Sequence, residues 1–127
     1  MIDIKLKDIV NSTDTLKQLA DMKLPGRVAW QVGKLLQRLE IELNLFSATR
    51  EKFIREFVDK DENGEMIVNE KTHEYVFTPE NKQQFINELN EVLEENIHID
   101  MDKISIDALA DLDFTPAQML VLEPFIE

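Results

Sequence analysis

The residues with the clearest chemical pattern lie between positions 59 and 70, where acidic and amide side chains recur. The segment fits the calcium-loop pattern of an EF-hand position by position: Asp59-Lys60-Asp61-Glu62-Asn63-Gly64-Glu65-Met66-Ile67-Val68-Asn69-Glu70. Such a loop binds calcium through oxygen ligands at alternate positions, turns at a central glycine and adds a carboxylate at its twelfth position. The residues before it are expected to form a helix, as an EF-hand requires.

Two features of this segment weigh against a calcium site. Residues 70–78 have the composition of a strand, whereas an EF-hand needs a second helix there. Ile67 also occupies a position where a polar ligand usually stands. A helix end, an Asn63-Gly64 turn and the first strand of a hairpin explain the same residues. We therefore expect no bound metal and no cofactor, with calcium at 59–70 as the alternative.

The remaining polar residues form no recognised catalytic arrangement. His73 and His98 fall in different expected elements without partners at metal-ligand spacing, and His98 should lie on the outward face of its strand. There is no G-x-S-x-G elbow for a serine nucleophile and no glycine-rich phosphate loop. The absence of cysteine excludes disulfides, thiolate metal sites and cysteine nucleophiles. We expect a protein that is not an enzyme.

The net charge of −12 is unevenly distributed along the chain. Residues 25–60 carry seven bases and five acids, whereas residues 61–127 carry seventeen acids and three lysines. Binding to phosphate needs clustered Lys and Arg, so we expect no direct contact with nucleic acid. The acidic half either keeps the surface soluble or occupies a basic cleft on a partner; the first interpretation is favoured.

A long helix is the strongest structural prediction. Nine positions follow a strict 3,4 alternation, and eight of them are apolar: Ala29, Val32, Leu36, Leu39, Leu43, Phe46, Arg50, Phe53 and Phe57. This is a heptad pattern, typical of a helix that packs along another helix. We expect one continuous helix from Pro25 to about Val58, about 50 Å long. A compact domain of this size is only about 36 Å across, so the helix should project or wrap.

Further side chains on this helix are candidates for binding a partner. Ile41, Leu45 and Ala48 form a second apolar stripe, and Trp30 lies one to two turns before them. We expect the sheet and other helices to cover this stripe, with a docking patch or a self-association face as the alternative. Arg50 interrupts the heptad pattern, where it either extends to solvent or pairs with a carboxylate.

The far end of the same helix raises the question of a homodimer. Phe53, Ile54 and Phe57 lie there, and large apolar side chains are costly to leave in water. Either residues 97–126 cover them or a second copy does, and we favour a symmetric pair. The candidate partner-binding residues are therefore Trp30, Ile41, Leu45, Arg50, Phe53 and Phe57.

The other elements indicate an α+β fold. A strand is predicted for 2–7, followed by a turn rich in helix caps at 11–14 and a short helix. Residues 66–68 and 75–77 should form a hairpin, a helix should run from Pro79 to about Glu94 burying Phe85, Ile86, Leu89, Val92 and Leu93, and 97–101 should be a strand. A helical turn at Ser105 and a short helix capped by Thr115 should follow. We predict a single domain over 1–127, with one long central helix and shorter helices packed on a small, mostly antiparallel sheet. We expect no signal peptide and no membrane span, because the first residues alternate and carry charge and no apolar run is long enough.

The order of several short motifs resembles a protein family. The chain opens with Ile2-Asp3-Ile4-Lys5-Leu6 and enters its long helix at Leu24-Pro25-Gly26-Arg27. Glu42-Leu43, Arg50 and Asp61-Glu62-Asn63-Gly64 follow, before Phe114-Thr115-Pro116-Ala117 and Leu122-Glu123-Pro124-Phe125-Ile126. Together they resemble a small phage and prophage protein family of Gram-positive bacteria with no known activity. The resemblance implies a viral origin and action in the host cytoplasm, and it assigns no binding residues.

These observations favour a non-enzymatic phage accessory protein. It would bind a host protein, such as a component of an anti-phage defence system, and inhibit or trigger it. The alternative is a virion-assembly chaperone or a structural component of the tail or head. In either case the expected partner is a protein, and not nucleic acid or a membrane.

Overall fold

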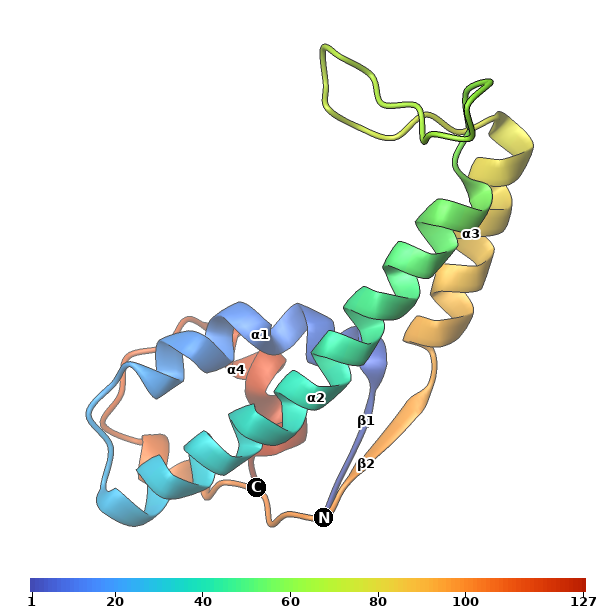
Figure 1. Ribbon diagram of the computed structural model, residues 1–127. Helices are drawn as coiled ribbons and strands as arrows, with labels where there is room; N and C mark the ends of the chain where they lie inside the picture. Colours follow the sequence, from blue (N-terminus) through green and yellow to red (C-terminus); the bar gives the residue numbers. More distant parts are fainter. The chain divides into compact units, whose positions relative to one another are not determined.

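The computed structural model describes residues 1–127 and divides the chain into two compact units (Figure 1). Unit 1 combines residues 1–43 with residues 94–127, and unit 2 consists of residues 44–93. The fold is α+β, as predicted, with a long helix, shorter helices and a small antiparallel sheet. The assignment of residues 1–127 to one domain remains a prediction.

The sheet belongs to unit 1 and has two strands, β1 (Ile2–Lys5) and β2 (Asn96–Ile99). They pair antiparallel, with Ile2 opposite Ile99 and Ile4 opposite Ile97. Because successive side chains in a strand point to opposite faces, the four isoleucines share the buried face and the polar residues point outward. Both predicted strands are present, but β1 ends at Lys5 and not at residue 7, and β2 ends at Ile99 and not at residue 101.

The start of the first helix differs from the prediction. β1 ends at Lys5 and α1 (Leu6–Ala20) begins at the next residue, so the segment 11–14 lies inside the helix and not in a turn. Ser12 Oγ and Thr13 Oγ1 donate hydrogen bonds to the carbonyl oxygen of Ile9 at 2.9 and 3.1 Å. These cap-forming residues are therefore accommodated within the helix by bonding back to the preceding turn.

Three short helical elements complete unit 1: η1 (Ile106–Leu109), α4 (Pro116–Leu122) and η2 (Glu123–Phe125). The predicted capping box is present, since Thr115 Oγ1 accepts from Gln118 N at 3.2 Å and Gln118 Oε1 accepts from Thr115 N at 2.9 Å. The core of the unit consists of buried apolar side chains: Ile2, Ile4, Leu6, Ile9, Leu16, Leu19, Val32, Leu35, Leu39, Ile97, Ile99, Ile104, Leu109, Leu122 and Phe125.

The long helix is confirmed as α2 (Gly26–Phe57), which contributes to both units. The heptad pattern located its buried residues only in part. Val32 and Leu39 are buried, but Ala29 is exposed, and Leu35 and Ile54 are buried although they lie outside the pattern. An α-helix drifts by about 20° per heptad from a 3.5-residue repeat, so one strict pattern cannot follow the buried face along this length. No helix in the chain combines the length and apolarity needed to cross a bilayer.

Unit 2 contains the C-terminal part of α2, the segment 59–78 and α3 (Pro79–Leu93). The prediction that 66–68 and 75–77 are strands of the sheet is wrong. They form only isolated antiparallel bridges, Lys60 with Met66 and Val68 with Tyr75. Each apolar run has three residues, and Val68 and Tyr75 remain 42% and 36% exposed, so little burial supports a longer ladder.

Helix α3 begins as predicted, because Thr78 Oγ1 accepts a hydrogen bond from Asn81 N at 3.3 Å and Pro79 follows the cap. The prediction that this helix buries its apolar side chains is wrong. None of its residues is fully buried, and Ile86 is 38% exposed. Few elements surround α3 in so small a unit, which leaves Phe85, Leu89, Val92 and Leu93 only half-buried.

An ion-pair cluster links the two chain segments that make up unit 1, residues 1–43 and 94–127. Glu94 accepts hydrogen bonds from the ammonium groups of Lys5 at 2.7 Å and Lys7 at 2.9 Å. These bonds hold the pKa of the Glu94 carboxyl at about 2, well below its ordinary value of 4.5. The same hydrogen bond raises the pKa of Lys7. A depressed carboxyl pKa stabilises the fold above the unfolded-state value near 4.5, and this contribution is lost as the pH falls towards 2.

We expect a carboxyl-carbon NMR titration to place the midpoint of Glu94 near pH 2. Combining Lys5→Ala with Lys7→Ala should return it close to 4.5, because the donors that favour the charged form are gone. The matched pair Lys17→Ala and Lys23→Ala should leave it unchanged. All three side chains are about half exposed, so high salt should also raise the midpoint. An identical midpoint in the Lys5 and Lys7 variant would contradict the assignment.

Candidate protein-docking surface

The most exposed aromatic side chain of unit 1 is Trp30, in the second turn of α2. It is 69% exposed, and Lys34, one turn later, places its ammonium 5.3 Å from the centre of the indole ring. This distance is typical of a cation–π contact. The backbone beneath is regular helix, with Ala29 N bonded to Pro25 O at 2.9 Å. Trp30 is therefore a large apolar side chain displayed from a rigid element.

A shallow hollow lies beside Trp30 in unit 1. Helix α2 and the segments near residues 101–105 and 127 line it: Arg27, Trp30, Gln31, Lys34, Met101, Asp102, Lys103, Ser105 and Glu127. Gln31 Nε2 donates to the carbonyl oxygens of Asp102 at 3.0 Å and Lys103 at 3.1 Å, which fixes that segment against the helix. Three of the lining residues are basic and two are acidic. The wall beside the indole is thus held in place and carries charges of both signs, with one more base than acids.

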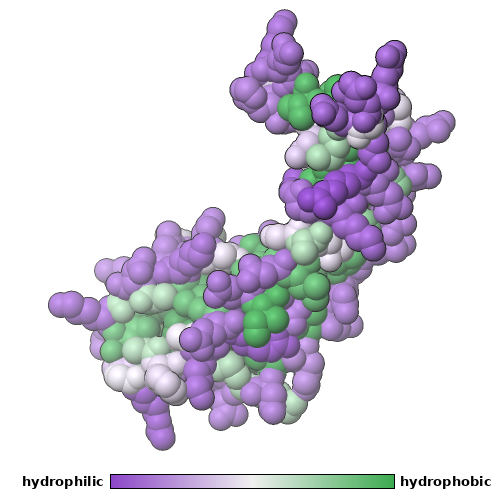
Figure 2. All heavy atoms as spheres, viewed as in Figure 1, coloured by the Kyte–Doolittle hydropathy of each residue, from purple (hydrophilic) through white to green (hydrophobic).

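Ile41 lies three helical turns after Trp30 on the same face of α2 and is 63% exposed. Apolar atoms also gather over α2 in the space-filling view (Figure 2). We call the surface formed by Trp30, Lys34 and Ile41 the Trp30 face. The expectation that other elements cover the second apolar stripe of α2 is wrong, because the side chains of Trp30 and Ile41 are exposed within unit 1. In unit 2, Leu45 is 63% exposed and Ala48 is also exposed.

The other three candidate residues belong to unit 2. Arg50 is exposed and forms none of the ion pairs in the structure, which agrees with the interpretation that it extends to solvent and not with the alternative of a carboxylate pair. Phe53 and Phe57 are half-buried, next to Ile54 and Val58, which are 2% and 4% exposed. Unit 2 therefore covers part of both rings by itself. The homodimer remains a prediction.

The calcium-like loop is organised by its own backbone. Asp61 Oδ1 accepts hydrogen bonds from Asn63 N and Glu65 N, both at 2.9 Å, and Gly64 has a φ of 79°, which suits glycine. The next helix begins only at Pro79, so a second EF-hand helix does not follow. No group of three or more His, Asp or Glu side chains is arranged to hold a metal ion. The Asp61 carboxylate acts here as the acceptor of a tight turn.

We expect millimolar calcium to leave the melting temperature unchanged, because a ligand raises it only by binding the folded state. Scanning calorimetry with calcium and with a chelator would measure this. The variant combining Asp59→Ala with Glu70→Ala should respond as the parent does. A clear rise that this variant abolishes would establish a site at 59–70.

The two histidines occupy different units. His98 is exposed on β2, and its Nδ1 contacts Asp3 Oδ1 of the neighbouring strand, in agreement with its predicted outward position. His73 lies in the segment 59–78, which we call the hairpin segment after its antiparallel bridges, and has a φ of 60°. Neither histidine belongs to a group of side chains that could hold a metal ion.

The sequence matches no protein-family model. No curated protein and no solved structure is significantly similar to the chain. A functional proposal therefore rests on the surfaces described above.

Proposed function

We propose that this chain is a non-enzymatic phage accessory protein that acts in the host cytoplasm by binding a host protein, such as an anti-phage defence component, as an inhibitor or trigger. The observation that carries the binding role is Trp30, which is 69% exposed on a rigid helix beside Lys34 and in line with Ile41. The resemblance of the ordered sequence motifs to phage and prophage proteins supports the viral origin.

The chemistry of the Trp30 face suits a protein partner. Tryptophan is among the residues that dominate binding energy at interfaces, because it buries a large rigid area. Burying a large apolar side chain gains roughly 1.5–3 kcal/mol relative to leaving it in water. The hollow beside the indole is lined by the basic Arg27, Lys34 and Lys103 and by the acidic Asp102 and Glu127, so bases exceed acids by one in an otherwise acidic chain. The complementary surface is therefore apolar at its centre and carries charges of both signs, with acids in slight excess, at its edge.

A phage deleted for this protein distinguishes the host-directed role from virion assembly. Plating would be compared on a host with the defence system and on the same host without it, with the parent chain or Trp30→Ala supplied from a plasmid. We expect the deletion to reduce plating only on the defended host, and only the parent chain to restore it. Loss of particles on both hosts would instead indicate an assembly chaperone or a structural component.

Direct binding tests the surface. The partner captured from infected cells would be purified and titrated calorimetrically with each variant. Trp30→Ala should weaken binding by about thirtyfold, the effect of a typical hot-spot residue. Leu120→Ala is a matched control, because Leu120 is also 69% exposed but lies on α4. Equal affinity of the folded Trp30→Ala variant would contradict the proposal. A mass above 14.8 kDa that falls in this variant would assign the face to a second copy.

A further inference from the structure

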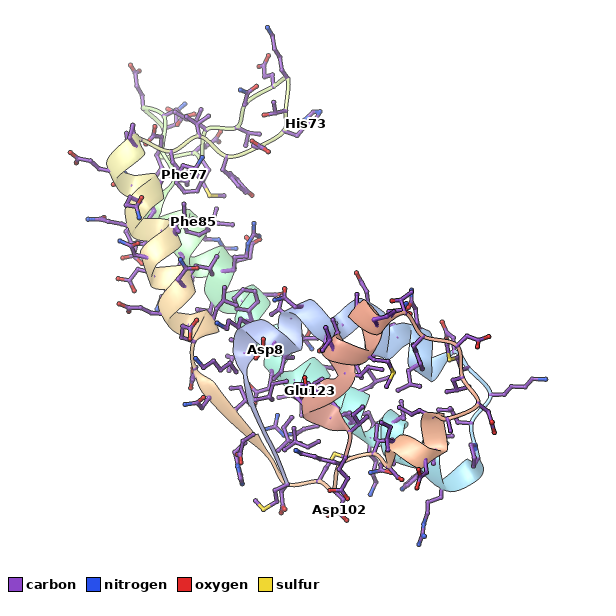
Figure 3. The ribbon with its side chains drawn as sticks, turned by 180° about the vertical axis from the view of Figure 1, so that it is seen from behind. Asp8, His73, Phe77, Phe85, Asp102 and Glu123 are labelled. Carbon is purple, nitrogen blue, oxygen red and sulfur yellow. The ribbon has the colours of Figure 1, made fainter.

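Unit 2 contains a hollow that the proposed function does not use. Helix α2, the hairpin segment and α3 each contribute to its lining: Arg50, Ile54, His73, Glu74, Tyr75, Phe77, Lys82 and Phe85. Its floor is apolar, since Ile54 is 2% exposed and the half-buried rings of Phe77 and Phe85 stack with centroids 5.2 Å apart (Figure 3). The other five lining residues are exposed and form a rim.

Backbone hydrogen bonds hold the hairpin wall of this hollow in place. Asp59 N donates to Val76 O at 2.8 Å, Val76 N to Ile67 O at 2.9 Å and Ile67 N to Asp59 O at 2.9 Å. At the turn, His73 N donates to Asn69 O at 2.7 Å. His73 itself is in the left-handed region, which is uncommon for a residue other than glycine and persists where the surroundings fix it. The wall is therefore preorganised.

The rim is basic in a chain whose net charge is −12. Arg50 and Lys82 lie on it and take part in none of the ion pairs of the structure, and Glu74 is its one acidic residue. An arginine guanidinium binds a carboxylate through two parallel hydrogen bonds, and a lysine adds a point charge. An aromatic floor below two available cations fits a ligand that is apolar at its centre and anionic beside it.

We propose that this hollow binds a short acidic peptide segment of a partner protein. An aromatic or aliphatic side chain of the peptide rests on Phe77 and Phe85, and flanking carboxylates pair with Arg50 and Lys82. This contact uses residues of unit 2 alone and goes beyond the role of the Trp30 face.

The open rim favours a peptide over a small molecule as the occupant. Sites for small molecules enclose most of the ligand surface, whereas five of the eight lining residues here are exposed. The overall negative charge does not prevent binding at physiological salt. Charges more than about 8 Å away are largely screened there, so the local rim decides the interaction.

The test uses the full chain and synthetic peptides. Amide shifts and calorimetric affinities would be measured with acetyl-Asp-Glu-Phe-Glu-Asp-amide, with its uncharged analogue acetyl-Asn-Gln-Phe-Gln-Asn-amide, and with acetyl-Asp-Glu-Ser-Glu-Asp-amide, which lacks the apolar side chain. We expect the first peptide to shift the lining residues and to bind about tenfold more tightly than either analogue, because only it uses both floor and rim.

Surface variants then test the two cations without disturbing the fold. Arg50→Gln combined with Lys82→Gln should weaken binding about tenfold, as expected for two exposed charge pairs. Lys52→Gln combined with Lys71→Gln makes the same charge change outside the hollow and should leave the affinity nearly unchanged. Equal weakening by both pairs would overturn the proposal, as would equal binding of the uncharged peptide. If inorganic phosphate alone caused the same amide shifts, the hollow would be a simple anion site and the peptide proposal would be overturned. Trp30→Ala should not affect peptide binding. A failure of the peptide proposal is therefore distinguishable from a failure of the proposed function, which depends on Trp30.

Discussion

Replacing Phe125 by alanine is expected to lower the free energy of unfolding of unit 1 by about 3–5 kcal/mol. The Phe125 side chain is fully buried, and the backbone carbonyl oxygen of Phe125 accepts a hydrogen bond from Ile104 N at 2.8 Å. Truncation removes buried apolar area and leaves a cavity that the close-packed neighbours cannot fill. Urea unfolding followed by circular dichroism would measure the loss.

The control for this variant is Leu120→Ala on α4. Leu120 is 69% exposed, so its truncation should change the free energy of unfolding by less than about 0.5 kcal/mol. A loss below about 1 kcal/mol for Phe125→Ala would mean that this ring does not belong to the core.

Asn44→Pro should cost about 3 kcal/mol of stability. Residue 44 lies in the interior of α2, which runs without a break from Gly26 to Phe57. Proline removes the amide that bonds to the carbonyl of residue 40, and its ring clashes with that carbonyl. Asn44 is exposed, so no buried side chain is lost and the effect reports on the helix itself.

Asn44→Ala is the matched control and should be neutral or slightly stabilising, because alanine has the higher helix propensity. Ellipticity at 222 nm and urea unfolding would compare the two variants. If the proline variant were as stable as the alanine variant, α2 would have to be interrupted near this position.

Local signals accounted for the elements that the sequence predicted well. Helix α2 follows from its apolar periodicity, and α3 and α4 follow from Thr78-Pro79 and from the Thr115–Gln118 capping box. Each signal consists of neighbouring residues that bond or pack within one element. Such interactions can be recognised without knowing the rest of the fold.

The missed features depend on residues that are distant in sequence. β1 gives way to α1 at Leu6, whose amide bonds to the carbonyl of Glu95 at 2.9 Å. No local pattern marks that switch. The same reason explains the second stripe of α2: its spacing identified Trp30, Ile41 and Leu45, but whether other elements cover them is a tertiary property.

The hollow of unit 2 also depends on tertiary contacts that the sequence does not reveal. Arg50 interrupts the apolar heptad pattern, but the pattern does not show which residues surround it in the fold. Phe77 and Phe85 come from different elements, and only folding brings their rings together over Ile54. Spacing in the sequence does not report such a convergence.

The pairing of β1 with β2 has a consequence for the order in which the protein folds. Residues 6–95 separate the two strands, and the whole of unit 2 lies within that interval. Unit 2 is contiguous, so a ribosome finishes it while unit 1 still lacks β2, α4 and η2. Until those elements are synthesised, the apolar side chains of β1 and α1 lack the residues that bury them in the folded unit. Such long-range contacts make folding slow and expose the nascent chain to aggregation. Closure of unit 1 by residues 94–127 is therefore the expected late step, and the step at which a nascent-chain chaperone has most to protect.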